Sequence, residues 1–216
     1  MKRNFIILTA VLAMSMLFGC SQNNNTENNQ KELPYAKAYI EKINELENTS
    51  EPSNPKSYSL VYLDSDDTPE LLAANNGSAI NLYTYANGKL YTIFEEWTYG
   101  AGGNAGYEYA EKENLIRNYT SDFAGLIQYV NYYTVDENFE ITPYYDKELK
   151  IYMFNDINGD GMPDEGEYEE NNLTEHKYFF GEDEVSKEDF DKYLKNGNFK
   201  FFEGTKNATE LIAELQ

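Results

Sequence analysis

The chain has 216 residues, and 38 acidic side chains against 17 basic ones give it a formal charge of −21 at pH 7. Such a surface repels nucleic acids and anionic headgroups, which excludes polyanion binding, whereas multivalent cations are its natural counter-ions. A single histidine and a single cysteine exclude an internal disulfide and leave too few ligands for a zinc site.

The first twenty residues have the organisation of a bacterial export signal. Two basic residues precede an apolar stretch that is too short to span a membrane, and this stretch ends in "LFGC". That ending resembles the lipobox of bacterial lipoproteins, in which the cysteine is lipidated and becomes the new N-terminus. The resemblance implies a signal peptide over residues 1–19, a membrane anchor on Cys20 and an extracytoplasmic location. The alternative is an ordinary secretory signal followed by a chance cysteine.

The segment after Cys20 is polar and almost free of apolar residues, so it cannot bury enough surface to fold. We therefore expect a disordered tether over residues 20–33 and one acidic domain over 34–216. Removal of residues 1–19 takes away two basic residues and no acid, which leaves 15 basic against 38 acidic side chains and a charge of −23.

The domain opens with "PYAKAYIEKINELEN", which predicts an amphipathic helix. Tyr35, Tyr39, Ile43 and Leu46 follow one another at spacings of four, four and three, so they form one apolar stripe. Two prolines in "TSEPSNPK" then end the helix.

From residue 57 the sequence changes to short runs rich in Tyr, Leu, Ile and Thr. "NNG" at 75–77 and "ANG" at 86–88 separate such runs and are strong hairpin signals. Strands that follow one another without intervening helices favour an antiparallel meander over alternating βα units.

The C-terminal part returns to helix. Ser186 is a predicted helix cap before the buried stripe of Phe190 and Leu194, and "NATELIAELQ" predicts a last short helix. The expected class is α+β: a mainly antiparallel β-sheet meander with an N-terminal helix and short C-terminal helices.

The stretch "MFNDINGDGMPDEGEYEE" at residues 153–170 places oxygen-bearing side chains at alternate positions around a glycine. "DINGDGMPDEGE" matches the calcium-loop pattern D-x-[DN]-x-[DN]-G-x5-E at every required position. Ca²⁺ takes about six to eight hard oxygens, and alternate side chains of a tightly turning loop converge on one point. Magnesium is disfavoured because it keeps its waters and seldom uses an all-protein cage. The sequence therefore predicts a Ca²⁺ site, with a solvated acidic turn as the alternative.

The residues around this loop argue against a helix–loop–helix EF-hand. "LKIYMF" before the loop has the character of a strand, and Pro163 removes the backbone N–H at position 8. "D-x-N-G-D-G-x-P-D" resembles instead the strand–loop–strand calcium sites of FG-GAP repeats. That resemblance implies as metal ligands Asp156, Asn158, Asp160, the Met162 carbonyl and Asp164, with Glu167 as an extra ligand.

"VYLDSDDTPELLAA" is a weaker second copy of the loop. Alignment of Pro69 with Pro163 superposes Asp64 on Asn158, Asp66 on Asp160, Thr68 on Met162 and Glu70 on Asp164. The first ligand is missing, because Tyr62 stands where the first loop has Asp156. Either a weak metal site or a plain turn fits this sequence.

These segments together resemble a group of exported lipoproteins of Gram-positive bacteria that carry D-x-D-x-D-G-x-P-E-L segments. "YFFGEDEVSKEDFDKYL" at 178–194 is similar to their common ending, and the resemblance spans most of the mature chain. It implies a lipid-anchored protein and no particular activity.

Two classes of function remain open. We expect a monomeric binding or accessory module, with a carbohydrate or cell-envelope polymer as a candidate partner. Most of the 20 tyrosines and 12 phenylalanines are expected in the core, and Trp97, Tyr99 and Tyr107 form a candidate sugar platform. The alternative is an extracellular hydrolase that uses paired carboxylates on a glycan or envelope polymer, although no pair stands out in so acidic a chain.

Overall fold

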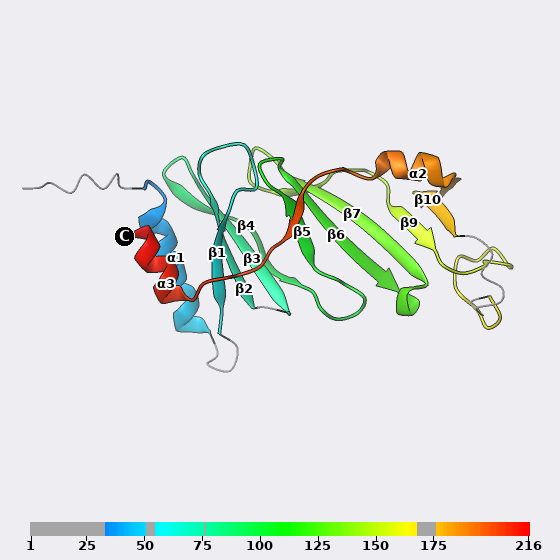
Figure 1. Cartoon of the computed structure of the whole chain (residues 1–216), viewed down its shortest axis with the longest axis horizontal. Helices are drawn as coiled ribbons and strands as arrows, with labels where there is room; N and C mark the ends of the chain where they lie inside the picture. Colours follow the sequence, from blue (N-terminus) through cyan, green and yellow to red (C-terminus); the bar gives the residue numbers. More distant parts are fainter. Residues whose placement is uncertain (1–32, 51–54, 76, 168–175) are drawn as a thin grey trace, which may run out of the picture. The chain divides into compact units, whose positions relative to one another are not determined.

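The computed structural model of the chain describes residues 33–50, 55–75, 77–167 and 176–216 (Figure 1). The predicted signal peptide, Cys20 and residues 20–32 of the predicted tether lie outside the described residues. Among the helices of the described ranges, none is long and apolar enough to cross a membrane.

Four antiparallel strands form the first sheet in sequence order: β1 (Ser57–Val61), β2 (Glu70–Asn75), β3 (Ala79–Ala86) and β4 (Lys89–Thr98). A two-residue turn joins β3 to β4, and both of its residues have positive φ, 52° at Asn87 and 76° at Gly88. Only Asn, Asp and Gly adopt this pair of conformations readily, which is why "ANG" makes a tight hairpin here.

Two helices, α1 (Ala36–Thr49) and α3 (Ala208–Leu215), pack on one face of the first sheet (Figure 1). Tyr39 and Ile43 from the predicted stripe are fully buried against Tyr58, Leu71 and Tyr83 of the sheet. The N-terminal helix is therefore confirmed, and its apolar stripe is the face that it buries.

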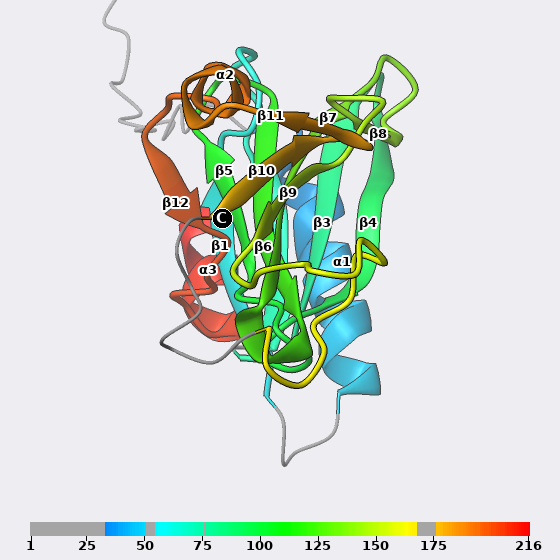
Figure 2. The same ribbon diagram turned by 90° about the vertical axis from the view of Figure 1, so that its right-hand side faces the viewer.

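The second sheet contains the remaining eight strands, in the order β11-β10-β9-β7-β6-β5-β12, with β8 paired to β7. Figure 2 shows the chain running from α2 (Lys187–Tyr193) to β12 at the edge of this sheet. Ser186 caps α2 by accepting a hydrogen bond from the Asp189 N–H, as predicted. The strands are β5 (Tyr107–Ala110), β6 (Leu115–Asp122), β7 (Ile127–Val135), β8 (Ile141–Pro143), β9 (Leu149–Tyr152), β10 (Lys177–Phe180), β11 (Asp183–Val185) and β12 (Phe199–Phe201), with a 3₁₀ turn at Phe123–Gly125 between β6 and β7.

The two sheets share one apolar core. Leu72 and Leu82 of the first sheet lie in the same buried cluster as Ile116 of the second. The ring of Phe202, which follows β12, lies 4.7 Å from the Tyr109 ring and 5.9 Å from the Phe94 ring. Phe202 therefore joins the second sheet to the first.

The predicted α+β class is confirmed, with mostly antiparallel strands, an N-terminal helix and short C-terminal helices. The division into two sheets is a finding of the structure. It explains why "ELLAA" in β2 is buried on both sides, because helices cover one face of that strand and the second sheet covers the other.

Candidate metal centre

The predicted calcium loop leaves the end of β9 and occupies residues 153–167 (the yellow loop in Figure 1). It therefore follows a strand, as expected, and not a helix. Gly161, at position 6 of the loop, has φ +76°, and a Cβ at this position would lie 3.0 Å from the Tyr152 hydroxyl. Both the backbone conformation and the close approach of Tyr152 require glycine here.

The side chains of the loop hold its backbone in a tight turn. One oxygen of Asp156 accepts the Gly159 N–H at 2.8 Å, and the other accepts the Gly161 N–H at 3.2 Å. Asn158 Oδ1 accepts the Asp160 N–H at 2.9 Å, which is a typical Asx turn. Alternate polar side chains thus accept hydrogen bonds from the backbone of their own loop and hold it in a tight turn.

Two carboxylates converge on the amide of Asn158. Its Nδ2 donates to Asp160 Oδ2 at 3.1 Å and to Asp164 Oδ2 at 2.9 Å. The partial positive charge of the amide therefore lies between two negative groups. A divalent cation at such a place would offset their repulsion far better than an amide does.

The donor set fits calcium, because every side chain involved offers hard oxygen atoms. Hydrogen bonds link the side chains of Asn158, Asp160 and Asp164. Asp156 lies on the same loop and accepts backbone N–H groups, and Met162 is 55% exposed. No three His, Cys, Asp or Glu side chains converge as a ready-made metal site anywhere in the described residues.

Unlike the other predicted ligands, Glu167 is buried and bonds to the backbone at both ends of the loop. Its side chain is buried, and its two oxygens accept the N–H of Ile157 at 2.7 Å and the N–H of Asp164 at 3.0 Å. The Asp164 and Ile157 N–H donors lower the pKa of Glu167, because they favour its charged form. Glu167 therefore closes the loop by joining its beginning to its end.

The second loop, residues 62–70, repeats part of this hydrogen-bond pattern. Asp64 Oδ1 accepts the Asp66 N–H at 2.9 Å, and Asp66 Oδ1 accepts the Thr68 N–H at 2.7 Å. In the first loop the Met162 N–H bonds to Asp160 in the same way. The sequence alignment of the two loops thus corresponds to matching Asx turns.

A buried glutamate also closes the second loop. Glu70 is only 2% exposed, and it accepts the Leu63 N–H at 2.8 Å and the Thr84 hydroxyl at 3.2 Å. Burial raises the pKa of Glu70 to about 7, and the nearby charge of Asp64 adds to the effect. Glu70, aligned in sequence with the ligand position of Asp164, therefore points into the fold.

The three aromatic residues of the candidate sugar platform are engaged in packing and turn contacts. The Trp97 ring stacks on Phe94 at 4.2 Å and lies 4.7 Å from the Tyr107 ring. The Tyr99 hydroxyl accepts the Gly77 N–H at 2.9 Å, and the Tyr107 hydroxyl accepts a hydrogen bond from Asn104. Trp97, Tyr99 and Tyr107 are each half-buried beside the core between the sheets.

Comparisons with protein-family models, with curated proteins and with solved structures find no match to this chain. Sequence reasoning found both loops, but it missed the role of the two closing glutamates. The signal was present for Glu70, because it directly precedes the continuous apolar run "LLAA" of a fully buried strand.

Proposed function

We propose that this protein is an extracytoplasmic lipoprotein whose acidic domain holds a structural calcium ion in loop 153–167. Cys20 carries the lipid anchor, and the domain acts as a monomeric binding or accessory module for a carbohydrate or envelope polymer. The N-terminal sequence supports the anchor, and the charge of −21 supports a cation as a resident of the domain.

The observation that carries the calcium assignment is the approach of two carboxylates to the side-chain amide of Asn158. Asp160 and Asp164 both lie within 3.1 Å of the Asn158 amide nitrogen. In this proposal Asp156, Asn158, Asp160 and Asp164 hold the ion together with the Met162 carbonyl.

A bound calcium ion would supply positive charge that offsets the mutual repulsion of these carboxylates. Glu167 contributes by keeping Ile157 and Asp164 together through its two hydrogen bonds. Extracellular calcium modules have Kd values of ~10⁻⁴–10⁻³ M, which suits an ion that stabilises a fold outside the cell and does not signal.

Thermal unfolding of the purified full chain, with calcium and with EDTA, tests this proposal. At a calcium concentration about tenfold above Kd, binding should raise the free energy of unfolding by about 1.4 kcal/mol and Tm by about 3–6 °C. Asp160→Ala should abolish this rise, because it removes one of the two converging carboxylates.

Asp191→Ala is the matched control, since it removes the same charge from the exposed face of α2, where Asp191 pairs with Lys187. The control variant should keep the calcium-dependent rise in Tm. Equal rises in both variants would show that calcium acts elsewhere on the acidic surface, and the loop assignment would then be wrong.

A further inference from the structure

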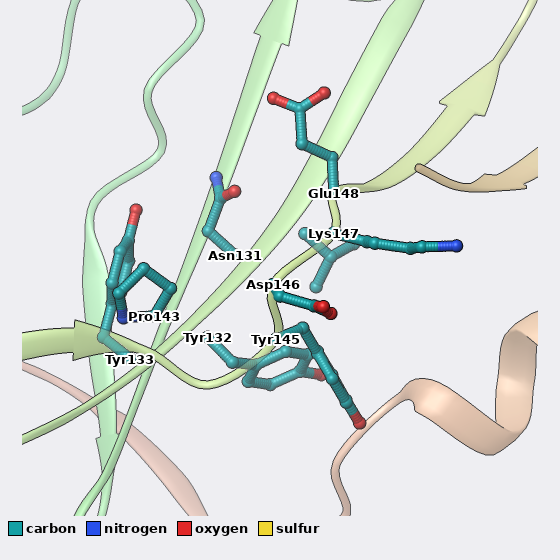
Figure 3. A pocket seen from close by; sticks show the side chains of 9 residues that line it. Asn131, Tyr132, Tyr133, Pro143, Tyr145, Asp146, Lys147 and Glu148 are labelled. Atoms are coloured by element: carbon teal, nitrogen blue, oxygen red, sulfur yellow. The ribbon is translucent and has the colours of Figure 1, made fainter. Parts of the chain in front are cut away.

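A second feature of the molecule, unrelated to the calcium loop, is a gap in the strand pairing of β7. This strand pairs with β9 over Ile127–Val130 and with β8 over Tyr133–Val135. The Tyr144 N–H still donates to the Tyr132 carbonyl, and the connecting residues 145–148 then leave the ladder between these two stretches. A pocket of about 270 Å³ opens where they do so (Figure 3).

The lining of this pocket combines apolar walls with oxygen-rich side chains. Tyr133 and Pro143 face one another across the β7–β8 pair, and Asn131, Asp146 and Glu148 add polar groups. Figure 3 shows the Asn131 amide and the Glu148 carboxylate rising on the same side of the β8–β9 connection. Within the described ranges, these three polar side chains form no hydrogen bond or salt bridge with other residues.

The one cationic side chain of the lining is already paired outside the pocket. Lys147 Nζ lies 3.1 Å from Asp183 Oδ2 and 5.3 Å from the centre of the Phe180 ring. Figure 3 shows its ammonium group directed away from Asn131 and Glu148. The carboxylates of Asp146 and Glu148 therefore leave the pocket with negative charge.

We propose that this pocket binds a primary ammonium group on a small scaffold, such as a single amino-sugar ring or a short aliphatic amine. Glu148 supplies a charge-assisted acceptor and the Asn131 oxygen supplies a second one, while Asp146 adds negative charge to the lining. Anionic ligands are excluded by the same two carboxylates. The volume lies just under the ~300–1,000 Å³ of typical ligand pockets, which suits one ring and not a longer oligomer.

Beside the pocket, the ammonium group of a lysine already lies over two tyrosine rings. Lys195 Nζ lies 4.1 Å from the centre of the Tyr144 ring and 5.2 Å from that of Tyr145, a residue that also lines the pocket. Ammonium groups gain electrostatic attraction over aromatic faces. The same chemistry is available to a ligand amine beside Tyr133.

Isothermal titration calorimetry of the full chain tests the proposal, with glucosamine as the probe and glucose as its neutral counterpart. EDTA is present throughout, so that the result is independent of the calcium loop. Glucosamine should bind and glucose should not, and Glu148→Gln should weaken glucosamine binding by about tenfold, the effect of losing one charge-assisted hydrogen bond. A glucosamine oligomer, added separately, should bind no more tightly than glucosamine, because the pocket has room for one ring.

Glu137→Gln is the matched control, because Glu137 is exposed in the β7–β8 turn and does not line the pocket. It removes the same charge and should leave glucosamine binding unchanged. Equal binding of glucose and glucosamine, absence of glucosamine binding, or equal weakening by both variants would each overturn the proposal. None of these three outcomes bears on the calcium loop.

Discussion

Two buried glutamates, Glu70 and Glu167, each close an acidic loop, yet their pKa values move in opposite directions. Glu167 accepts two backbone N–H groups, and these donors favour its charged form. Glu70 also accepts a backbone N–H, but the desolvation of its buried carboxylate outweighs that donor and raises its pKa. Glu70 is therefore a carboxylate whose charge depends on pH close to neutrality.

This shift makes stability depend on pH in a definite direction. The pKa of Glu70 rises from its ordinary value of 4.5 to about 7 in the folded protein. Between these values the folded state holds a proton that the unfolded state has lost, so the free energy of unfolding falls as pH rises. A shift of this size corresponds to roughly 3 kcal/mol.

Glu70→Gln should remove this contribution, because glutamine stays neutral and still accepts the Leu63 N–H. Urea unfolding at pH 5 and pH 8 should show that the variant loses less stability over this range than the wild type, by roughly 3 kcal/mol. The exposed Glu113→Gln is the control and should keep the wild-type dependence. A variant Glu70→Gln with the wild-type dependence would contradict the prediction.

At the scale of elements, α3 shows how a short helix is held in place. Asn207 accepts the Glu210 N–H at 3.0 Å, and the Glu210 carboxylate accepts the Asn207 N–H at 2.9 Å, which completes a capping box. Leu211 and Leu215 are buried against the first sheet. Eight residues alone do not form a stable helix, so the cap and the buried face together specify it.

Asn207→Ala should destabilise the protein by about 1 kcal/mol, because the Glu210 N–H loses its partner. Thermal unfolding followed by circular dichroism should show Tm lower by about 2–4 °C. Asn207→Asp keeps the acceptor oxygen and should stay near the wild-type Tm. Equal losses in the two variants would mean that the cap contributes nothing.

At the scale of the whole domain, the two sheets are joined by packing and by backbone hydrogen bonds. The N–H groups of Lys112 and Asn114 in the β5–β6 turn donate to the carbonyls of Tyr62 and Leu63, which follow β1. Phe202 fills the apolar core between the sheets and is 2% exposed. We therefore expect both sheets to unfold as one cooperative unit.

Phe202→Ala should cost about 3–5 kcal/mol, since it leaves a cavity where three rings meet. Chemical unfolding followed by Trp97 fluorescence and by circular dichroism should give coincident transitions, both shifted to lower denaturant. Phe201→Ala, one residue earlier, is the control and should cost much less, because Phe201 is 50% exposed. Separate transitions for the two signals would show that the sheets unfold independently.

Local patterns predicted the individual elements well. The helix stripe of Tyr39 and Ile43, the "ANG" hairpin and the Ser186 cap each depend on residues close together in sequence, and each appears as expected. The alternation of oxygens in loop 153–167 likewise predicted side chains that fold back on a tight turn. Calcium in that loop and lipid on Cys20 stay predictions.

The residues that these patterns could not place are those whose environment comes from distant parts of the chain. Trp97 lies against Tyr107 and Tyr133 of the other sheet, and the buried Glu70 accepts a hydrogen bond from Thr84 of the neighbouring strand β3. The pocket above Asn131 exists because β7 exchanges one partner strand for another. The spacing of residues within one segment cannot predict which distant strands pair or pack against it.

The sequence by itself thus determined the charge of the molecule, its elements and the acidic loops, because spacing, turn residues and caps act over a few neighbouring positions. The tertiary structure alone decided which carboxylates are buried, which rings are packed and where a cavity opens. Burial and desolvation depend on what other strands and helices cover, and that is a property of the assembled sheets.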